Sequence, residues 1–469
     1  MLSINLDDVM QVLTNVRSYL IAFGVVLALA IIVMVAVRKL PKAKKKMIRA
    51  QSGLAILLAL TIVINLICTG PMSTMLDLVS GSGTISEETS AKATQLVNEI
   101  TAEGVVLAKD EDNVLPVASG SKLNVFGWSS TNPCYGGTGS GALNTAYPVT
   151  DLLTGLHDAG IETNEELSKF YTDYKADRPS VGMVEQDWTL PEPNVNLYTD
   201  EMMENAKAFS DTAMVVITRV GGEGADLYTG EFTDGTSYFE LQDSERELLK
   251  YVASQGFSKT IVLINSSNAM AMDWVNNPEY GVDACLWIGG PGQYGLNAVA
   301  QILVGDVNPS GRLVDTYSVS SLSSAAIQNF GSYVYTNADE ETGTVGGVTI
   351  DGVPGDKTKV RYAIHYLVES EGIYVGYKYY ETRYEDAVME QGNASGNAGI
   401  FASKGDSWVY GEEVAYPFGY GMSYTTFEQA LESVTYDAAT DSFTVLVKVT
   451  NTGNVAGKEV VQVYGQQPY

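Results

Sequence analysis

The chain has 469 residues and a mass of 50.4 kDa, and 45% of its residues are hydrophobic, so it can bury a full core and is not intrinsically disordered. Its 56 acidic residues against 28 basic ones give a net charge of −28. This charge argues against a nucleic-acid-binding protein, because such proteins need clustered Lys and Arg. The three cysteines and two histidines form neither a disulfide framework nor a zinc-binding spacing, so we expect no metal site.

Two apolar segments near the N-terminus predict a membrane hairpin. Tyr19–Val37 contains no charged residue and is long enough to cross a bilayer as a helix, and Gly53–Thr69 is a second such run. The basic segment Arg38–Arg49 lies between them as a short loop, which the positive-inside rule places in the cytoplasm. A cleaved signal peptide is disfavoured, because the basic cluster follows the first apolar run instead of preceding it. We therefore expect residues 1–75 to be two transmembrane helices in contact with lipid. Everything after about Met75 should be extracytoplasmic, in a multi-pass protein of the cell membrane.

Residues 76–90 contain the segment SGSGTISEETS and predict a linker, after which short apolar strands alternate with helices through residues 91–320. This alternation is typical of a mostly parallel sheet sandwiched by helices, so the predicted fold class is α/β. The expected strands are Leu123–Gly127, Ala213–Thr218, Thr260–Asn265 and Asp283–Ile288. The expected helical segments are Ile100–Lys109 (the end of a helix), Val149–Ala159, Ser244–Ser254 with a capping box at Ser244–Glu247, Ala269–Val275 and Gly292–Val304.

The pattern of apolar and polar residues changes twice in the C-terminal part of the chain. Residues 321–424 are irregular and are expected to complete the sandwich domain and to link it to a C-terminal domain. Residues 425–469 alternate between apolar and polar side chains, which predicts strands at Ser433–Tyr436, Phe443–Thr450 and Glu459–Tyr464. About three strands make only a partial antiparallel β-sandwich, since such a domain needs roughly seven. We therefore expect the chain to be a fragment that stops inside this domain.

One carboxylate, Glu223, stands among the glycines of Gly221–Gly224, shortly after the strand Ala213–Thr218. Ligands of open α/β sheets bind at the carboxyl ends of the strands, and glycines let another group come close. A general acid/base at Glu223 requires an environment that raises its pKa. The simpler alternative is a glycine-rich turn with a solvated acid. The neighbouring acids that compete for the catalytic role are Asp226, Glu231 and Asp234.

The other glycine-rich and aromatic segments leave alternatives open. Gly136–Gly141 has the glycines of a dinucleotide-binding loop, but Trp128–Tyr135 separate it from the strand, so a loop overhanging a pocket fits better. Gly289–Gln293 is interpreted as a tight strand-to-helix turn, and Arg312 as a structural ion-pair partner. The tyrosine cluster is compatible with sugar stacking or with a packed interdomain seam; its members are Tyr374, Tyr377, Tyr379, Tyr380 and Tyr384.

Taken together, these segments resemble glycoside hydrolase family 3, the β-glucosidase and β-xylosidase type, over roughly residues 88–469. The matching motifs are Glu103–Glu111 with Leu115-Pro116, Val125–Gly127, Gly136–Gly141, Ile217–Gly224, Asn308–Leu313, Glu371–Tyr377 and Tyr416–Thr425. In that family a (β/α)8 barrel carries an aspartate nucleophile, and a following α/β sandwich domain supplies the acid/base glutamate. A fibronectin type III-like domain often comes after the sandwich domain.

The resemblance implies that Glu223 is the catalytic acid/base and that Ser140, Gly139 and Arg219 bind the substrate. Residues 1–87 are too short for a barrel of roughly 250 residues, so the chain resembles a member with inverted domain order. It is expected to stop in a fibronectin type III-like domain before a barrel in cis that carries the nucleophile. The implied function is hydrolysis of O-glycosyl bonds, releasing terminal β-linked glucose from oligosaccharides or β-glucosides with retention. The alternatives are a non-catalytic, membrane-anchored carbohydrate-binding or scaffold protein and, less favoured, a dinucleotide-dependent enzyme.

Overall fold

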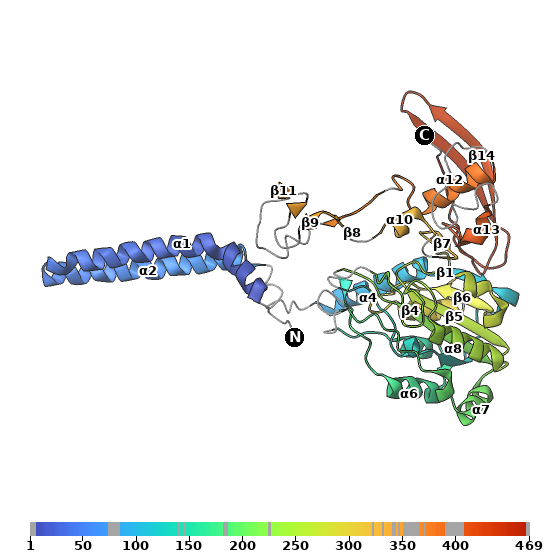
Figure 1. Cartoon of the computed structure of the whole chain (residues 1–469). Coiled ribbons are helices and arrows are strands. Elements are labelled where there is room, and N and C mark those ends of the chain that lie inside the picture. Colours follow the sequence, from blue (N-terminus) through green and yellow to red (C-terminus); the bar gives the residue numbers. More distant parts are fainter. Residues whose placement is uncertain are drawn as a thin grey trace. The chain divides into compact units, whose positions relative to one another are not determined.

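The computed structural model describes residues 6–73, 85–138, 141–143, 147–181, 186–223, 227–320, 323–330, 333–339, 344–345, 348–349, 365–369, 371–389 and 408–465. The chain forms two compact units, Met1–Ser90 and Ala91–Tyr469, which Figure 1 shows coloured along the sequence. Each unit has its own internal packing.

The first unit contains a pair of long helices. α1 spans Leu6–Ala36 and α2 spans Lys42–Thr69, and the two lie side by side along their length (Figure 1). The 3-10 turn η1, Val37–Lys39, joins them. Val16–Lys39 and α2 are both long and apolar enough to cross a membrane, with mean hydropathies of 3.2 and 2.3. The two expected apolar helices are therefore present, whereas their crossing of a membrane stays a proposal.

The basic segment between the helices differs from the loop that we expected. Most of it, from Lys42 onward, forms the first turns of α2, and Pro41 occupies the position just before the helix. Lys, Ala, Met and Arg are strong helix formers, and the fixed backbone of proline suits a helix start. The connection between the two helices is therefore only Val37–Pro41, and the cationic side chains of α2 lie on a helix.

The core of the second unit is a six-stranded sheet in the order β1-β6-β5-β4-β2-β3. Neighbours among β2 to β6 pair in parallel, and the edge strand β1 is antiparallel to β6. The strands are β1 Val106–Asp110, β2 Lys122–Phe126, β3 Glu162–Thr163, β4 Thr212–Arg219, β5 Lys259–Ser266 and β6 Ala284–Trp287. The predicted mixed α/β fold with a mostly parallel sheet is confirmed.

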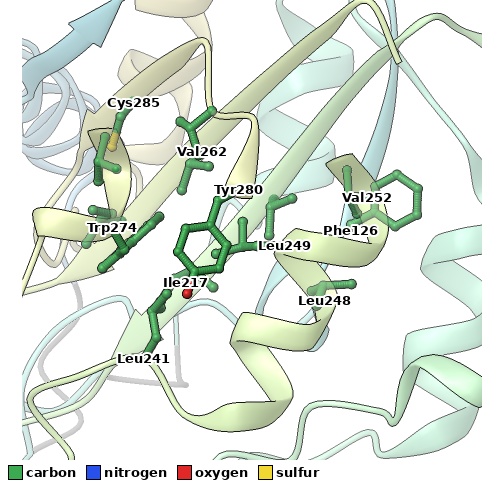
Figure 2. Packing of buried hydrophobic residues seen from close by; sticks show 14 of the residues in the cluster. Phe126, Ile217, Leu241, Leu248, Leu249, Val252, Val262, Trp274, Tyr280 and Cys285 are labelled. Atoms are coloured by element: carbon green, nitrogen blue, oxygen red, sulfur yellow. The ribbon is translucent and has the colours of Figure 1, made fainter. Parts of the chain in front are cut away.

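Helices cover both faces of this sheet. The helical segments are α4 Glu87–Gly104, η2 Glu111–Asn113, η3 Trp128–Ser130, α5 Leu152–Asp158, α6 Glu165–Tyr174, η5 Val195–Leu197, α7 Asp200–Phe209, α8 Asp243–Ser254, η6 Asp273–Asn276, η7 Pro278–Tyr280 and α9 Leu296–Leu303. On one face α6, α7 and α8 pack against alternate strand residues, and Figure 2 shows Leu248 and Leu249 of α8 in one cluster with Ile217 and Val262. On the other face α5 and α9 pack against the residues in between, such as Val216. Because both faces are covered, all eight residues of β4 are buried.

Three local expectations were wrong. The expected end of a helix at Ile100–Lys109 contains the end of α4 and then β1, because the apolar run after Gly104 fills the edge of the sheet. The capping box of α8 is formed by Gln242 and Glu245, two residues before the predicted pair, since Glu245 accepts from the backbone N–H of Gln242 at 2.9 Å. The expected helix Ala269–Val275 is only the short η6.

The described residues between 317 and 465 form small elements and one long hairpin. The small elements are β7 Tyr317–Ser318, α10 Ala325–Gln328, β8 Tyr333–Val334, β9 Ala338–Asp339, β10 Thr344–Val345, β11 Val348–Thr349, β12 His365–Tyr366, α12 Tyr377–Ala387, α13 Tyr410–Glu413 and β13 Val414–Tyr416. The hairpin pairs β14 Phe427–Asp437 with β15 Ser442–Asn451. The third expected strand, Glu459–Tyr464, is not a strand. That segment instead contacts the sandwich through an ion pair of 2.8 Å between Arg312 and Glu459, as expected for Arg312.

Candidate active site

The parallel strands β2, β4, β5 and β6 end at the same edge of the sheet, and the loops after them meet there. In open α/β sheets this carboxyl edge is where ligands bind. The loop after β4 carries Glu223, and the loop after β2 leads into the glycine-rich segment Gly136–Gly141. Hydrogen bonds and close backbone contacts join these loops, so the candidate site is built from segments far apart in the sequence.

Glu223 lies in the turn after β4, and the residue is exposed. Its backbone carbonyl oxygen accepts a hydrogen bond of 2.9 Å from the Thr138 hydroxyl. The preceding Gly222 lies against the same residue, since a Cβ at position 222 would approach the backbone nitrogen of Thr138 to 2.2 Å. The turn is thus anchored through its main chain at the surface, while Asp226 and Gly224 fall outside the described residues.

The glycines before Glu223 allow the backbone of its turn to lie close to the neighbouring loops. A Cβ on Gly221 would lie 2.4 Å from the side-chain nitrogen of Asn268, in the loop after β5, and neither Gly221 nor Gly222 has a positive φ. Larger residues at these two positions would push the turn away from the loops on either side. At Gly221 and Gly222 the absence of a side chain therefore serves close packing, because neither residue has the left-handed backbone conformation that would itself require glycine.

Asn265, at the end of β5, holds the glycine-rich loop in place. Its side-chain oxygen accepts from the backbone N–H of Cys134 at 2.6 Å, and its side-chain nitrogen donates to the carbonyl oxygens of Cys134 and Gly289 at 2.8 and 2.6 Å. The amide is fully buried, so it joins two loops at the carboxyl edge with no competition from water. Gly139 and Ser140, predicted to bind substrate, lie outside the described residues of this loop.

Arg219, the last residue of β4, does not reach the surface as a substrate ligand would. Arg219 is only 1% exposed. Two of its side-chain nitrogens donate to the carboxylate of Glu245 at 2.8 and 2.7 Å. Its remaining donors bind the carbonyl oxygens of Thr218, Tyr238 and Glu240. All five N–H groups of the guanidinium are used inside the protein, so this geometry makes Arg219 a residue that positions the start of the Glu223 loop.

The other carboxylates near the turn differ in their surroundings. Burial would raise the pKa of Asp234, but hydrogen bonds from Thr236 and from the backbone of Asp243 outweigh it and lower that pKa. Asp234 is therefore suited to stay ionised, and Glu231 is an exposed surface acid. Sequence reasoning missed Glu192, whose carboxyl accepts from the backbone N–H of Trp128 at 2.9 Å. Burial raises the pKa of Glu192 well above its ordinary value, which makes it the strongest rival to Glu223 as a proton donor.

A cation and a thiol lie at the same edge. Arg178 lies over the ring of Trp128 at 5.0 Å and donates to the Thr218 hydroxyl at 2.9 Å, which links the segment after β2 to the end of β4. Burial raises the pKa of the Cys134 thiol, although Arg178 opposes this, so the thiol is protonated and poorly nucleophilic at neutral pH. Among the residues that the structure describes, no three His, Cys, Asp or Glu side chains gather as a metal site.

The sequence held weak signals for the residues that were missed. Asn265 ends the otherwise apolar run TIVLIN, and a lone amide at the carboxyl end of a buried strand indicates a structural or ligand role. Glu245 was included in a predicted capping box, but only tertiary contact shows that it also pairs with Arg219. Glu192 had no local signal, because its raised pKa comes from burial in the folded protein, where it accepts from the backbone of Trp128, 64 residues away in the sequence.

Comparison with known proteins agrees with the resemblance in sequence. The family model described as "Glycosyl hydrolase family 3 C-terminal domain" matches residues 105–424. A beta-glucosidase from Ruminococcus albus is 30% identical over 79% of this chain and 32% of its own length. Beta-glucosidase A from Butyrivibrio fibrisolvens is 29% identical over 81% of this chain and 42% of its own length. The chain thus spans less than half the length of these relatives.

Solved structures show the same likeness. A beta-glucosidase from Paenibacillus barengoltzii superposes with a TM-score of 0.56 at 31% identity, over 77% of this chain and 33% of that one. Beta-glucosidase 3B from Thermotoga neapolitana, solved in complex with glucose, superposes with a TM-score of 0.56 at 29% identity, over 78% of this chain and 43% of that one. Because the family model matches more than half of its length, this chain belongs to glycosyl hydrolase family 3.

Proposed function

We propose that this chain supplies the acid/base half of a β-glucosidase that hydrolyses O-glycosyl bonds with retention and releases terminal β-linked glucose. The observation that carries the proposal is the position of Glu223, on an exposed turn at the carboxyl edge that is packed through glycines against two neighbouring loops. Relatives named as beta-glucosidases, one of them solved with glucose, support the same substrate class.

In this proposal Glu223 performs two proton transfers. As a carboxylic acid it protonates the oxygen of the leaving group while an aspartate attacks the sugar carbon, and as a carboxylate it then takes a proton from the water that releases glucose. The aspartate belongs to a (β/α)8 barrel in cis. When that barrel covers the carboxyl edge it also excludes water, which is the kind of environment that a carboxylic proton donor needs.

The remaining roles depend on how the loops are held. Ser140 and Gly139 are proposed to line the glucose pocket, because the segment just before them is fixed by Asn265 at the same edge as Glu223. Arg219 is proposed to act on the loop instead of on the sugar. The proton transfers themselves need no metal and no cofactor.

The two N-terminal helices are proposed to anchor the protein in the cell membrane. Their apolar side chains are largely exposed, and the basic residues of η1 and of the first turns of α2 favour the cytoplasmic side. The sandwich domain would then act on substrates outside the cytoplasm. The hairpin β14–β15 is proposed to begin a fibronectin type III-like domain in residues 425–469.

Replacement of Glu223 tests the assignment in the intact gene product. Glu223→Gln should lower kcat/KM for methyl β-glucoside by roughly 100-fold or more and much less for 2,4-dinitrophenyl β-glucoside, whose leaving group needs little protonation. Glu192→Gln is the matched control and should not show this dependence on the leaving group. With Glu223→Ala, azide should restore turnover of the activated substrate and yield β-glucosyl azide.

The outcomes separate the alternatives. Equal losses on both substrates would make Glu223 a structural residue, and a leaving-group dependence that appears in Glu192→Gln would transfer the role to Glu192. An intact protein that binds glucose without hydrolysing either substrate would favour a carbohydrate-binding or scaffold protein.

A further inference from the structure

Seven basic side chains lie where α1 and α2 are joined, and neither helix supplies an acid near them. η1 carries Arg38 and Lys39, and the first turns of α2 carry Lys42, Lys44, Lys45, Lys46 and Arg49. α2 contains no Asp or Glu, and the two acids of α1 are Asp7 and Asp8 at its start. At 1.5 Å per residue, Asp8 is about 42 Å from Ala36 along the helix axis. The segment Arg38–Arg49, called the basic junction below, is therefore not neutralised by the two helices that it joins.

Most cations of the basic junction are exposed to the surroundings of the helix pair. The exposed members are Arg38, Lys39, Lys42, Lys44 and Lys46. Lys45 is half-buried, and Arg49 is engaged with α1, because its Nε and Nη2 atoms both donate to the carbonyl oxygen of Met34 at 3.3 Å. Lys42 and Lys46 are one helical turn apart, a spacing at which like charges destabilise a helix. An anionic partner would relieve this repulsion.

The length of α2 determines the depth of these cations in a bilayer. The apolar run Gly53–Thr69 is about 26 Å long as a helix, close to the roughly 30 Å of a hydrocarbon core. The same helix continues toward its N-terminus through Lys42–Arg49 for about 12 Å. All of α2 is then about 42 Å long, which matches the roughly 40–45 Å of a bilayer with its headgroups. With the apolar run in the hydrocarbon core, the basic turns lie at the level of the lipid headgroups, and the helix holds them there.

We propose that the basic junction binds the phosphate groups of anionic phospholipids in the leaflet on its side of the membrane. The proposal rests on the proposed membrane anchoring and is independent of the proposed hydrolysis. The second unit is an unsuitable partner, although it holds nearly all Asp and Glu residues of the chain. A hairpin that crosses the bilayer twice has both of its ends on the face opposite to its junction, so the bilayer separates that unit from the cations. Each Lys or Arg near an anionic membrane surface should strengthen binding roughly fivefold.

Lipid selectivity in a reconstituted bilayer tests the proposal. The full-length protein is placed in nanodiscs of phosphatidylcholine and phosphatidylglycerol in equal amounts, with a trace of one or the other lipid carrying a spin label. Electron spin resonance then measures the fraction of each labelled lipid that the protein immobilises. Because many of the contacting lipids touch only apolar side chains, the average preference for phosphatidylglycerol should be roughly two- to fivefold.

Two matched variants change the charge at the same four positions, Lys42, Lys44, Lys45 and Lys46. Replacement of all four by Gln removes the charge and keeps a good helix former, and it should at least halve the preference. Replacement of all four by Arg keeps the charge and should keep the preference. In the native protein, salt at about 1 M should bring the preference toward equality, because the Debye length falls to about 3 Å.

The outcomes separate this inference from the proposals on which it rests. Equal immobilisation of the two labelled lipids by the native protein would overturn it, and so would a preference that survives the four Gln substitutions. A preference that the Arg variant loses as fully as the Gln variant would show that charge is not its cause. Failure of the protein to enter the discs would remove both the membrane anchor and the lipid site. A protein that prefers phosphatidylglycerol in this charge-dependent way but hydrolyses no glucoside would support the lipid site and contradict the proposed hydrolysis.

Discussion

Strand β4 and the hairpin β14–β15 are both rich in apolar residues, but their surroundings are opposite. All eight residues of β4 are buried between two layers of helices. In the hairpin, Leu431, Tyr436 and Phe443 are 65%, 54% and 70% exposed, although cross-strand pairing is regular over most of its length. The hairpin is therefore formed by backbone pairing and cross-strand contacts such as that between Tyr436 and Phe443, whereas a core needs side-chain layers that other segments must bring.

The comparison also explains where the candidate site lies. A parallel strand that is buried on both faces ends abruptly in a loop, and its last residue must satisfy its polar groups inside the protein. In β4 that residue is Arg219, paired with Glu245. The rigid end of β4 then gives the Glu223 turn a fixed base, which a hairpin with exposed side chains could not provide.

The largest expected effect is at this end of β4. Arg219→Leu leaves the Glu245 carboxylate buried and unpaired, and the loss of a buried partner should cost about 3–5 kcal/mol of unfolding free energy. All five tryptophans lie in residues 91–469, so denaturant unfolding followed by their fluorescence reports on this unit. The matched change on the hairpin, Lys448→Leu, should stay within about 0.5 kcal/mol. A loss below about 1 kcal/mol in Arg219→Leu would mean that the pair does not hold the edge of the sheet.

Two substitutions of apolar residues by alanine compare how much burial in β4 and in the hairpin contributes to the free energy of unfolding. Ile217→Ala in β4 removes fully buried methyl groups and should cost about 2–5 kcal/mol. Leu446→Ala in β15, where the side chain is 52% exposed, should cost about 0.5 kcal/mol or less. A cost above about 1.5 kcal/mol at Leu446 in the intact protein would break the comparison, because it would show that another surface covers the hairpin.

Removal of the Asn265 amide should have an intermediate effect and a local signature. Asn265→Leu preserves volume but leaves the backbone groups of Cys134 and Gly289 unsatisfied, which should cost about 1–3 kcal/mol. Amide hydrogen exchange should accelerate in residues 131–138 and not in β14–β15. Equal protection in the variant and the native protein would contradict the role of Asn265 in holding the glycine-rich loop.

The smallest expected effect is a pH dependence at Asp234. Its pKa is lower in the folded protein than in the unfolded chain, so the unfolded state binds the proton more readily as the pH falls. The stability that Asp234 contributes is complete above about pH 4 and is lost as the pH falls through its folded pKa. Asp234→Asn should flatten the loss of stability below about pH 4, by tenths of a kcal/mol at this exposed site. An unchanged acid limb of the stability curve would show that the hydrogen bonds from Thr236 do not hold the carboxylate.

The sequence predicted those helices and strands whose pattern of apolar residues matches the way they are buried in the fold. The strands β2, β4, β5 and β6 were found because each is a short, mostly apolar run, as expected for a strand covered on both faces. The edge strand β1 was missed, since its apolar run begins within two residues of a helix and looks like the end of that helix. The third strand of the C-terminal sheet was predicted from alternation, but a strand also needs a partner, and the segment at Glu459 pairs instead with Arg312 through its side chain.

The sequence by itself determined the fold class, the family and the position of Glu223 in a glycine-rich turn, because hydrophobic period and motif spacing are local properties of the chain. Only the tertiary structure decided what surrounds that turn. It turned Arg219 from a predicted ligand into a buried partner of Glu245 and revealed Asn265 as the link between loops. Charge pairing and loop contacts depend on residues far apart in sequence, and their free energies exist only once the sheet and its helices have packed.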